Sequence, residues 1–101
     1  MVKIHGQWCG PNWTQGKSQP ANASGVNFNA PCDDALDCAC RSHDKDCSNP
    51  KGCSAKGDRR LVVAALKYAA NPINRLFRPE TVLKAEAVAV GISAASLTRK
   101  R

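Results

Sequence analysis

Six cysteines in a chain of 101 residues limit what this sequence can fold into more than any other feature. Leu, Ile, Val and Phe together number only 18, and 15 alanines, which bury little area, supply much of the remaining apolar content. A core with so little apolar area gives only marginal stability unless covalent cross-links support it, and six cysteines can form three disulfides. Disulfides favour an oxidising compartment. We therefore expect one secreted or extracellular domain over residues 1–101, and the length excludes a multidomain enzyme.

The sequence contains no clear signal for membrane insertion or for targeting. No uncharged run, including the apolar one over residues 87–98, reaches the roughly 20 residues that a membrane span needs. The first six residues contain no apolar segment of a signal peptide. We expect either that a signal has been removed or that export uses another route.

Charge is distributed unevenly along the chain. Residues 1–50 contain four Lys or Arg and five Asp, whereas residues 51–101 contain eleven Lys or Arg and three acids. The net charge of +7 suits anionic partners such as phospholipid surfaces or nucleic acid. If the basic residues of the second half cluster, they favour adsorption to an anionic membrane.

Residues 1–31 are rich in turn-forming Gly, Pro, Asn and Ser, show no sustained periodicity, and are predicted to be loop. A helix is predicted over residues 33–46, because Asp33 or Asp34 can cap it and acids suit its positive end. Its buried stripe follows helical spacing and contains Leu36, Cys40, His43 and Cys47.

Two further helices follow a turn-rich connection over residues 48–57. One is predicted over residues 58–70 and ends before a proline. The other is predicted over residues 79–97 and begins with a proline, which is tolerated in a first turn. The basic residues 98–101 are expected to fray. These patterns predict a mainly α-helical protein.

The most informative residues are His43 and Asp44, which are adjacent and so diverge by about 100° on a helix. His43 can act as a general base if a carboxylate fixes its tautomer, and Asp44 can bind a hard cation. Asp44 lies on the same helix face as Cys40, four residues earlier. If Cys40 pairs with Cys9, the turn over residues 8–12 is fastened beside Asp44.

That turn offers oxygen ligands for a cation. The backbone carbonyls of Trp8, Gly10 and Asn12 belong to alternate residues of a tight loop. Together with one carboxylate and water they make a reasonable cage for Ca²⁺, which takes roughly 6–8 oxygen ligands.

The loop WCGPNW over residues 8–13, followed by PCDDxLDxxCxxHD over residues 31–44, resembles secreted phospholipase A2. The match is to that family's calcium loop and Cys-x-x-His-Asp active-site helix, and it covers about residues 6–66. The helix signature is specific, whereas the loop alone is weak. The resemblance implies a small disulfide-stapled fold with two antiparallel core helices, an N-terminal calcium loop and a C-terminal helix.

The resemblance also implies roles for individual residues. His43 corresponds to the base that activates water against the sn-2 ester of a glycerophospholipid. Asp44 and the three loop carbonyls correspond to the Ca²⁺ ligands, and the Gly10 amide to an oxyanion donor beside the ion. Asp58 corresponds to the aspartate that hydrogen-bonds the far nitrogen of the histidine. The implied products are a lysophospholipid and a free fatty acid.

Some positions depart from the family pattern. Asn12 replaces a glycine, and asparagine is the next best residue for a left-handed backbone. Cys47 replaces a tyrosine that supports the aspartate–histidine pair. Two disulfides of the family have lost both partners: Ala39 and Ala64 occupy one pair of positions, and Asp46 and Gly57 the other.

The remaining disulfides follow from helix geometry once Cys9–Cys40 is assumed. Cys38 and Cys47 are separated by nine helical residues, about 13 Å, and Cys32 and Cys47 lie further apart. Both separations exceed the roughly 7 Å that a disulfide allows between Cα atoms. We therefore predict Cys32–Cys38 and Cys47–Cys53.

Other interpretations of Asp58 and of the function also fit the sequence. Asp58 can equally be a plain N-cap for the helix that follows it. A non-catalytic module on the same scaffold, binding a membrane or a receptor, is the second functional hypothesis. A zinc or nucleic-acid module is disfavoured because no C-x₂-C pair and no base-reading helix are found. We expect a monomer that contacts an anionic phospholipid surface and no nucleic acid.

Overall fold

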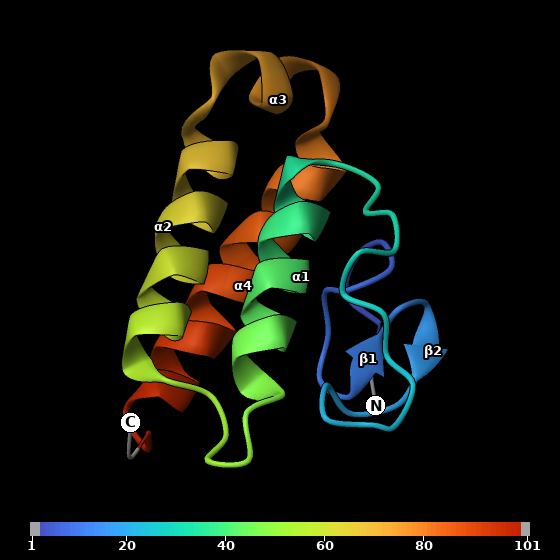
Figure 1. Ribbon diagram of the computed structural model, residues 1–101. Coiled ribbons are helices and arrows are strands. Elements are labelled where there is room, and N and C mark those ends of the chain that lie inside the picture. Colours follow the sequence, from blue (N-terminus) through green and yellow to red (C-terminus); the bar gives the residue numbers. More distant parts are fainter. Residues whose placement is uncertain (1–2, 100–101) are drawn as a thin grey trace.

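The computed structural model describes residues 3–99 and is mainly helical (Figure 1). Three long helices lie side by side, and the short α3 (Pro72–Phe77) connects two of them at one end. The long helices are α1 (Ala35–Cys47), α2 (Ala55–Ala70) and α4 (Pro79–Ser96). Helices α1 and α2 pack antiparallel, as predicted, while residues 1–2 and 100–101 of the expected domain lie outside the described part.

Helix α1 begins where its capping residue predicts. The Asp34 side chain accepts a hydrogen bond of 2.8 Å from the backbone N–H of Asp37, which is the geometry of an N-cap. The helix buries Leu36, Cys40 and His43 on one face, whereas Cys47 is only half-buried. The predicted range of 33–46 is therefore confirmed to within two residues at each end.

Helix α2 begins three residues earlier than predicted, and this changes the interpretation of Asp58. The N-cap is Ser54, whose hydroxyl accepts from the Gly57 N–H at 3.0 Å and donates to Asp46. Asp58 is therefore not a cap: it lies in the first turn of α2, fully buried. The helix ends at Ala70, before the proline, as expected.

The sequence does not predict α3. Pro72 ends α2, but Asn71 then caps a new six-residue helix by accepting from the Ile73 N–H at 2.9 Å. Helix α4 follows at Pro79 and ends at Ser96, one residue short of the predicted range. It packs along α2 through Val82, Ala85, Val88 and Ala89.

The first 31 residues are not loop throughout, so this prediction is partly wrong. A small hairpin pairs β1 (Trp13–Thr14) with β2 (Lys17–Ser18). Its two turn residues, Gln15 and Gly16, have φ of 55° and 70°, as a tight two-residue hairpin requires. Alternating apolar residues, the usual signal of a strand, are missing from strands this short.

The N-terminal segment is fastened to α1 by one buried carboxylate and one disulfide. Asp37 accepts hydrogen bonds from the backbone N–H groups of Gln7 and Trp8 at 2.8–3.1 Å, and the adjacent Cys9 is bonded to Cys40. Trp8 is buried and stacks on Phe28 with ring centroids 5.7 Å apart. The other two disulfides are Cys32–Cys38 and Cys47–Cys53. All three predicted disulfides are confirmed.

Candidate functional site

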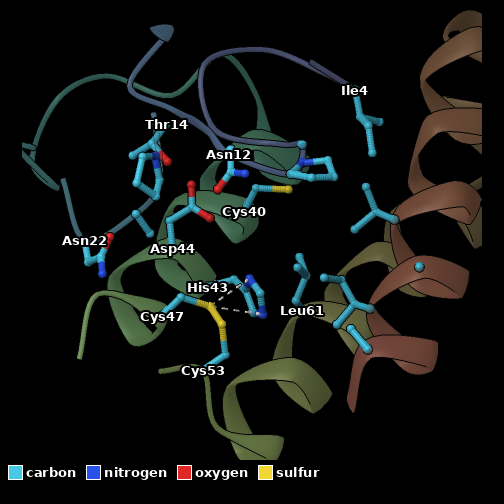
Figure 2. Close-up of a pocket in the computed structure, with 18 of the residues that line it drawn as sticks. Ile4, Asn12, Thr14, Asn22, Cys40, His43, Asp44, Cys47, Cys53 and Leu61 are labelled. Carbon is cyan, nitrogen blue, oxygen red and sulfur yellow. Dashed lines mark hydrogen bonds between the residues drawn. A yellow bond between two sulfur atoms is a disulfide. The ribbon is translucent and has the colours of Figure 1, made fainter. Parts of the chain in front are cut away.

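A cavity of about 460 Å³ lies between the N-terminal segment, α1 and α4. Gly10 and Asn12 from the loop and His43 and Asp44 from α1 line it together (Figure 2). The Cys9–Cys40 disulfide joins the two segments directly beside them. The structure thus brings together residues 30 or more positions apart that the sequence predicts to form one site.

His43 is held from behind by Asp58. Its Nε2 atom lies 2.6 Å from Oδ1 of Asp58, and the two side chains are 8% and 1% exposed. Because a carboxylate only accepts hydrogen bonds, Nε2 is the donor in this contact, and in the neutral form of the ring Nδ1 is then the nitrogen with the lone pair. The nearest polar contact of Nδ1 among the described residues is the Cys47 sulfur at 3.7 Å. The neutral form of His43, which lines the cavity, therefore has one nitrogen available to accept a proton.

Asp58 is stabilised by a second partner that the sequence does not predict. Arg99 donates from Nε to Oδ2 at 2.7 Å and from Nη2 to Oδ1 at 3.2 Å. Burial alone raises the pKa of Asp58, but the hydrogen bonds and charges of Arg99 and His43 outweigh it and lower the pKa below its usual value. Asp58 is thus an anion facing His43. Residues 98–101 were expected to fray, but Arg99 makes these two contacts, and residues 100–101 lie outside the described part.

Asp44 has the features of a cation ligand. Its Oδ2 atom is buried and has no hydrogen-bond partner among the described residues. Burial, together with the nearby charge of Asp37, raises the pKa of Asp44 to about 8, and a hydrogen bond from Thr14 offsets part of the rise. A buried carboxylate oxygen without a partner is costly unless a cation or proton accompanies it.

The loop supplies backbone groups beside this carboxylate. Asn12 has φ of 51°, so it adopts the left-handed conformation expected of it, and Gly10 has φ of 143°, which residues with a side chain rarely adopt. The Gly10 carbonyl accepts from the Trp13 N–H at 3.2 Å, and a carbonyl oxygen has a second lone pair for a cation. The Gly10 N–H has no acceptor among residues 3–99.

The fit to Ca²⁺ can be judged from these groups. Asp44 provides an orphaned carboxylate oxygen, and Gly10 and Asn12 line the same cavity. Trp8, the third expected carbonyl donor, has its side chain in the core and does not line the cavity. Oxygen donors of this kind suit a hard cation, so the residues present fit Ca²⁺.

A second group of possible metal ligands is less suitable. A ring nitrogen of His43 and the sulfurs of Cys47 and Cys53 lie within 4.8 Å of one another. The two sulfurs are, however, joined in a disulfide, and thiolates are the form that binds metals. While the disulfide is intact, His43 is the only strong ligand of the three.

The rest of the cavity wall is largely apolar, and α4 provides much of it. The small side chains of this helix leave room beside His43, and the sequence did not indicate this role for it. The apolar lining residues on α2 and α4 are Leu61, Ala87, Val88, Ile92 and Ala95.

The positions at which the family that the chain resembles has two further disulfides also come together. A Cβ atom placed on Gly57 would lie 3.2 Å from Cβ of Asp46, close to the 3.5–4.5 Å usual for a disulfide. Ala39 and Ala64 line a second, smaller cavity that Asp46 and Gly57 also line. Both pairs therefore occupy the α1–α2 interface, as their assignment to paired positions predicts.

No protein-family model, characterised protein or solved structure matches this chain. Among the helices of residues 3–99, none combines the length and hydropathy required to cross a bilayer.

Proposed function

We propose that this protein is a calcium-dependent phospholipase A2, which hydrolyses the sn-2 ester of glycerophospholipids to a lysophospholipid and a free fatty acid. The observation that carries the proposal is one cavity containing a buried, unpartnered carboxylate oxygen of Asp44 beside a His43–Asp58 pair. The resemblance of residues 6–66 to the secreted family supplies the substrate and the position of the scissile bond. The specific phospholipase A2-like fold belongs to the same proposal.

His43 is the general base in this mechanism. Its Nδ1 atom accepts a proton from a water molecule as the water oxygen attacks the carbonyl carbon of the sn-2 ester. Asp58, bound to Nε2 at 2.6 Å, holds the ring in this tautomer and stabilises the imidazolium that forms. The same proton then passes from Nδ1 to the departing glycerol oxygen, which leaves as the lysophospholipid.

The developing oxyanion requires stabilisation, which is usually the largest contribution to catalysis. The Gly10 N–H, which has no acceptor among residues 3–99, is assigned as one donor. Asp44 and the carbonyls of Gly10 and Asn12, which line the cavity as Trp8 does not, would hold Ca²⁺, and as a Lewis acid the ion would supply positive charge to the ester oxygen. The apolar wall of α4 would contact the acyl chain.

Partner and location follow from the same proposal. The substrate is presented by a phospholipid surface, and the positive second half of the chain favours an anionic one. Three disulfides are stable outside the reducing cytosol, so the proposed location is extracellular. We propose that the protein acts as a monomer and binds no nucleic acid.

Fatty-acid release from mixed micelles tests the function directly. Substrates labelled in the sn-1 or sn-2 acyl chain are incubated with wild type and His43→Gln, in millimolar Ca²⁺ and in EDTA. We expect release of the sn-2 label by wild type with Ca²⁺ only. Micelle disruption that continues in EDTA and in His43→Gln, without fatty-acid release, would support the non-catalytic binding module instead.

A further inference from the structure

The Arg99 side chain extends from the segment that follows α4 to the buried centre of the site. It follows α4, which ends at Ser96, and its backbone N–H donates to the Ser96 carbonyl at 3.2 Å. Its side chain reaches Asp58, 41 positions earlier, with both oxygens of the carboxylate in contact. Arg99 also lines the cavity that contains His43.

Two-point contact with a guanidinium controls both the rotation and the charge of a carboxylate. The Asp58 side chain is 1% exposed, and among the described residues its only side-chain donors are His43 and Arg99. The Cys47 sulfur, which lies 3.7 Å from Nδ1 of the imidazole, is bonded to Cys53 and has no proton to donate. Without Arg99, Oδ2 of Asp58 would be buried with no partner, and the carboxylate could turn away from His43.

We propose that Arg99 is a positioning residue: by holding both oxygens of Asp58, it fixes the His43 ring with Nδ1 directed at the cavity. This inference rests on the proposed function. The proposal gives α4 a second role besides packing, because the residues that follow this helix place the Arg99 guanidinium beside the first turn of α2. The catalytic unit is then His43–Asp58–Arg99, with its third member outside the stretch that resembles the secreted family.

A merely structural contact and a positioning contact predict different kinetics. If the ion pair only fastens the segment after α4, removing it lowers stability and leaves turnover per folded molecule unchanged. If Arg99 positions Asp58, its removal lowers kcat and changes KM little, because Arg99 acts on the reacting groups through another side chain.

The test compares Arg99→Ala and Arg99→Lys with Arg75→Ala, below the melting temperature of each variant. Arg75 is a matched control, because it donates to the Ala69 carbonyl at 3.2 Å and does not line the cavity. We expect kcat of Arg99→Ala to fall roughly tenfold to a hundredfold, with KM within about twofold of wild type. Arg99→Lys keeps the charge and should recover part of the loss, and millimolar methylguanidinium should partly restore Arg99→Ala but not His43→Gln.

Equal kcat values for Arg99→Ala and Arg75→Ala would overturn the proposal. It would also be overturned if neither the Arg99→Lys substitution nor added methylguanidinium restored any of the lost activity. A second readout does not need activity: the NMR resonance of the His43 Nε2 proton, expected far downfield in wild type because of the 2.6 Å hydrogen bond. In Arg99→Ala and Arg99→Lys this resonance should shift or broaden, and an unchanged resonance contradicts the proposal. If wild type releases no fatty acid, the proposed function fails, while the resonance still decides whether Arg99 orients the pair.

Discussion

Replacing Asp44 by asparagine should stabilise the calcium-free protein while removing its calcium site. The pKa of Asp44 is raised to about 8, so at pH 7 the folded protein holds this proton and the unfolded chain, with a pKa of about 3.9, does not. At about 1.4 kcal/mol per pKa unit, taking up the proton costs at most about 4 kcal/mol at pH 7. Asparagine avoids this cost. Its buried amide, however, needs hydrogen-bond partners of its own, and leaving them unmade costs about 1–3 kcal/mol.

The expected net gain for Asp44→Asn is therefore about 1–3 kcal/mol at pH 7 in EDTA. The sign follows from proton binding: between pH 4 and 8 the folded wild type holds one proton more than the unfolded chain. The free energy of unfolding of wild type therefore falls as pH rises through this range. The advantage of Asp44→Asn should be absent at pH 4, where the unfolded chain also begins to hold the proton, and largest at pH 8.

Urea unfolding of both proteins at pH 4, 6 and 8, with Ca²⁺ and with EDTA, measures these differences. Calcium should stabilise wild type, by about 2.7 kcal/mol at a hundred times its Kd, and leave Asp44→Asn unchanged. A variant that is less stable than wild type in EDTA at pH 8, or that is still stabilised by Ca²⁺, would refute the reasoning about Asp44.

Three further predictions concern the metal, the disulfide and the cavity. Because a proton must leave Asp44 on binding, the apparent Ca²⁺ affinity measured by calorimetry should weaken about tenfold for each pH unit below 8; an affinity independent of pH between 6 and 8 would contradict this. Replacing Cys9 and Cys40 together by serine, which opens a link across 31 positions, should cost about 2–5 kcal/mol in chemical unfolding and abolish calcium-dependent stabilisation; retention of calcium binding would show that the disulfide does not hold the loop in place. Gly91 lines the cavity within α4, and a Cβ atom there would meet nothing within 4 Å. Gly91→Ala should therefore raise stability by about 1 kcal/mol, whereas Gly91→Phe should fill the cavity and lower hydrolysis of long-chain esters more than of short-chain ones; equal losses on both would argue against an acyl site along α4.

Local signals made α1 and the disulfides predictable. Asp34 caps α1 as its sequence position indicates, and helix geometry leaves one pairing for four of the cysteines once Cys9–Cys40 is assumed. The positions of His43 and Asp44 on neighbouring faces follow from the helical period alone. These predictions depend on interactions within a few residues or on covalent limits.

Contacts between distant segments account for the predictions that failed. Helix α2 begins at Ala55 because Asp46 holds the capping Ser54 through its N–H and hydroxyl, and this contact depends on how α1 and α2 pack. The same shift moves Asp58 from an apparent cap into the buried first turn. Arg99 meets Asp58 across 41 positions, and in the sequence it is one basic residue in a basic tail. The nearest signal in the sequence was Cys47, which stands where the family that the chain resembles has a tyrosine supporting the aspartate–histidine pair.

Diffraction from a crystal grown in millimolar Ca²⁺, with the ion located by its anomalous signal, tests the central claim most directly. We predict one ion bound by Oδ2 of Asp44 and by carbonyl oxygens of Gly10 and Asn12, with Nδ1 of His43 facing it across the cavity. An ion bound elsewhere, or residues 8–12 lying away from Asp44 in that crystal, would contradict the account.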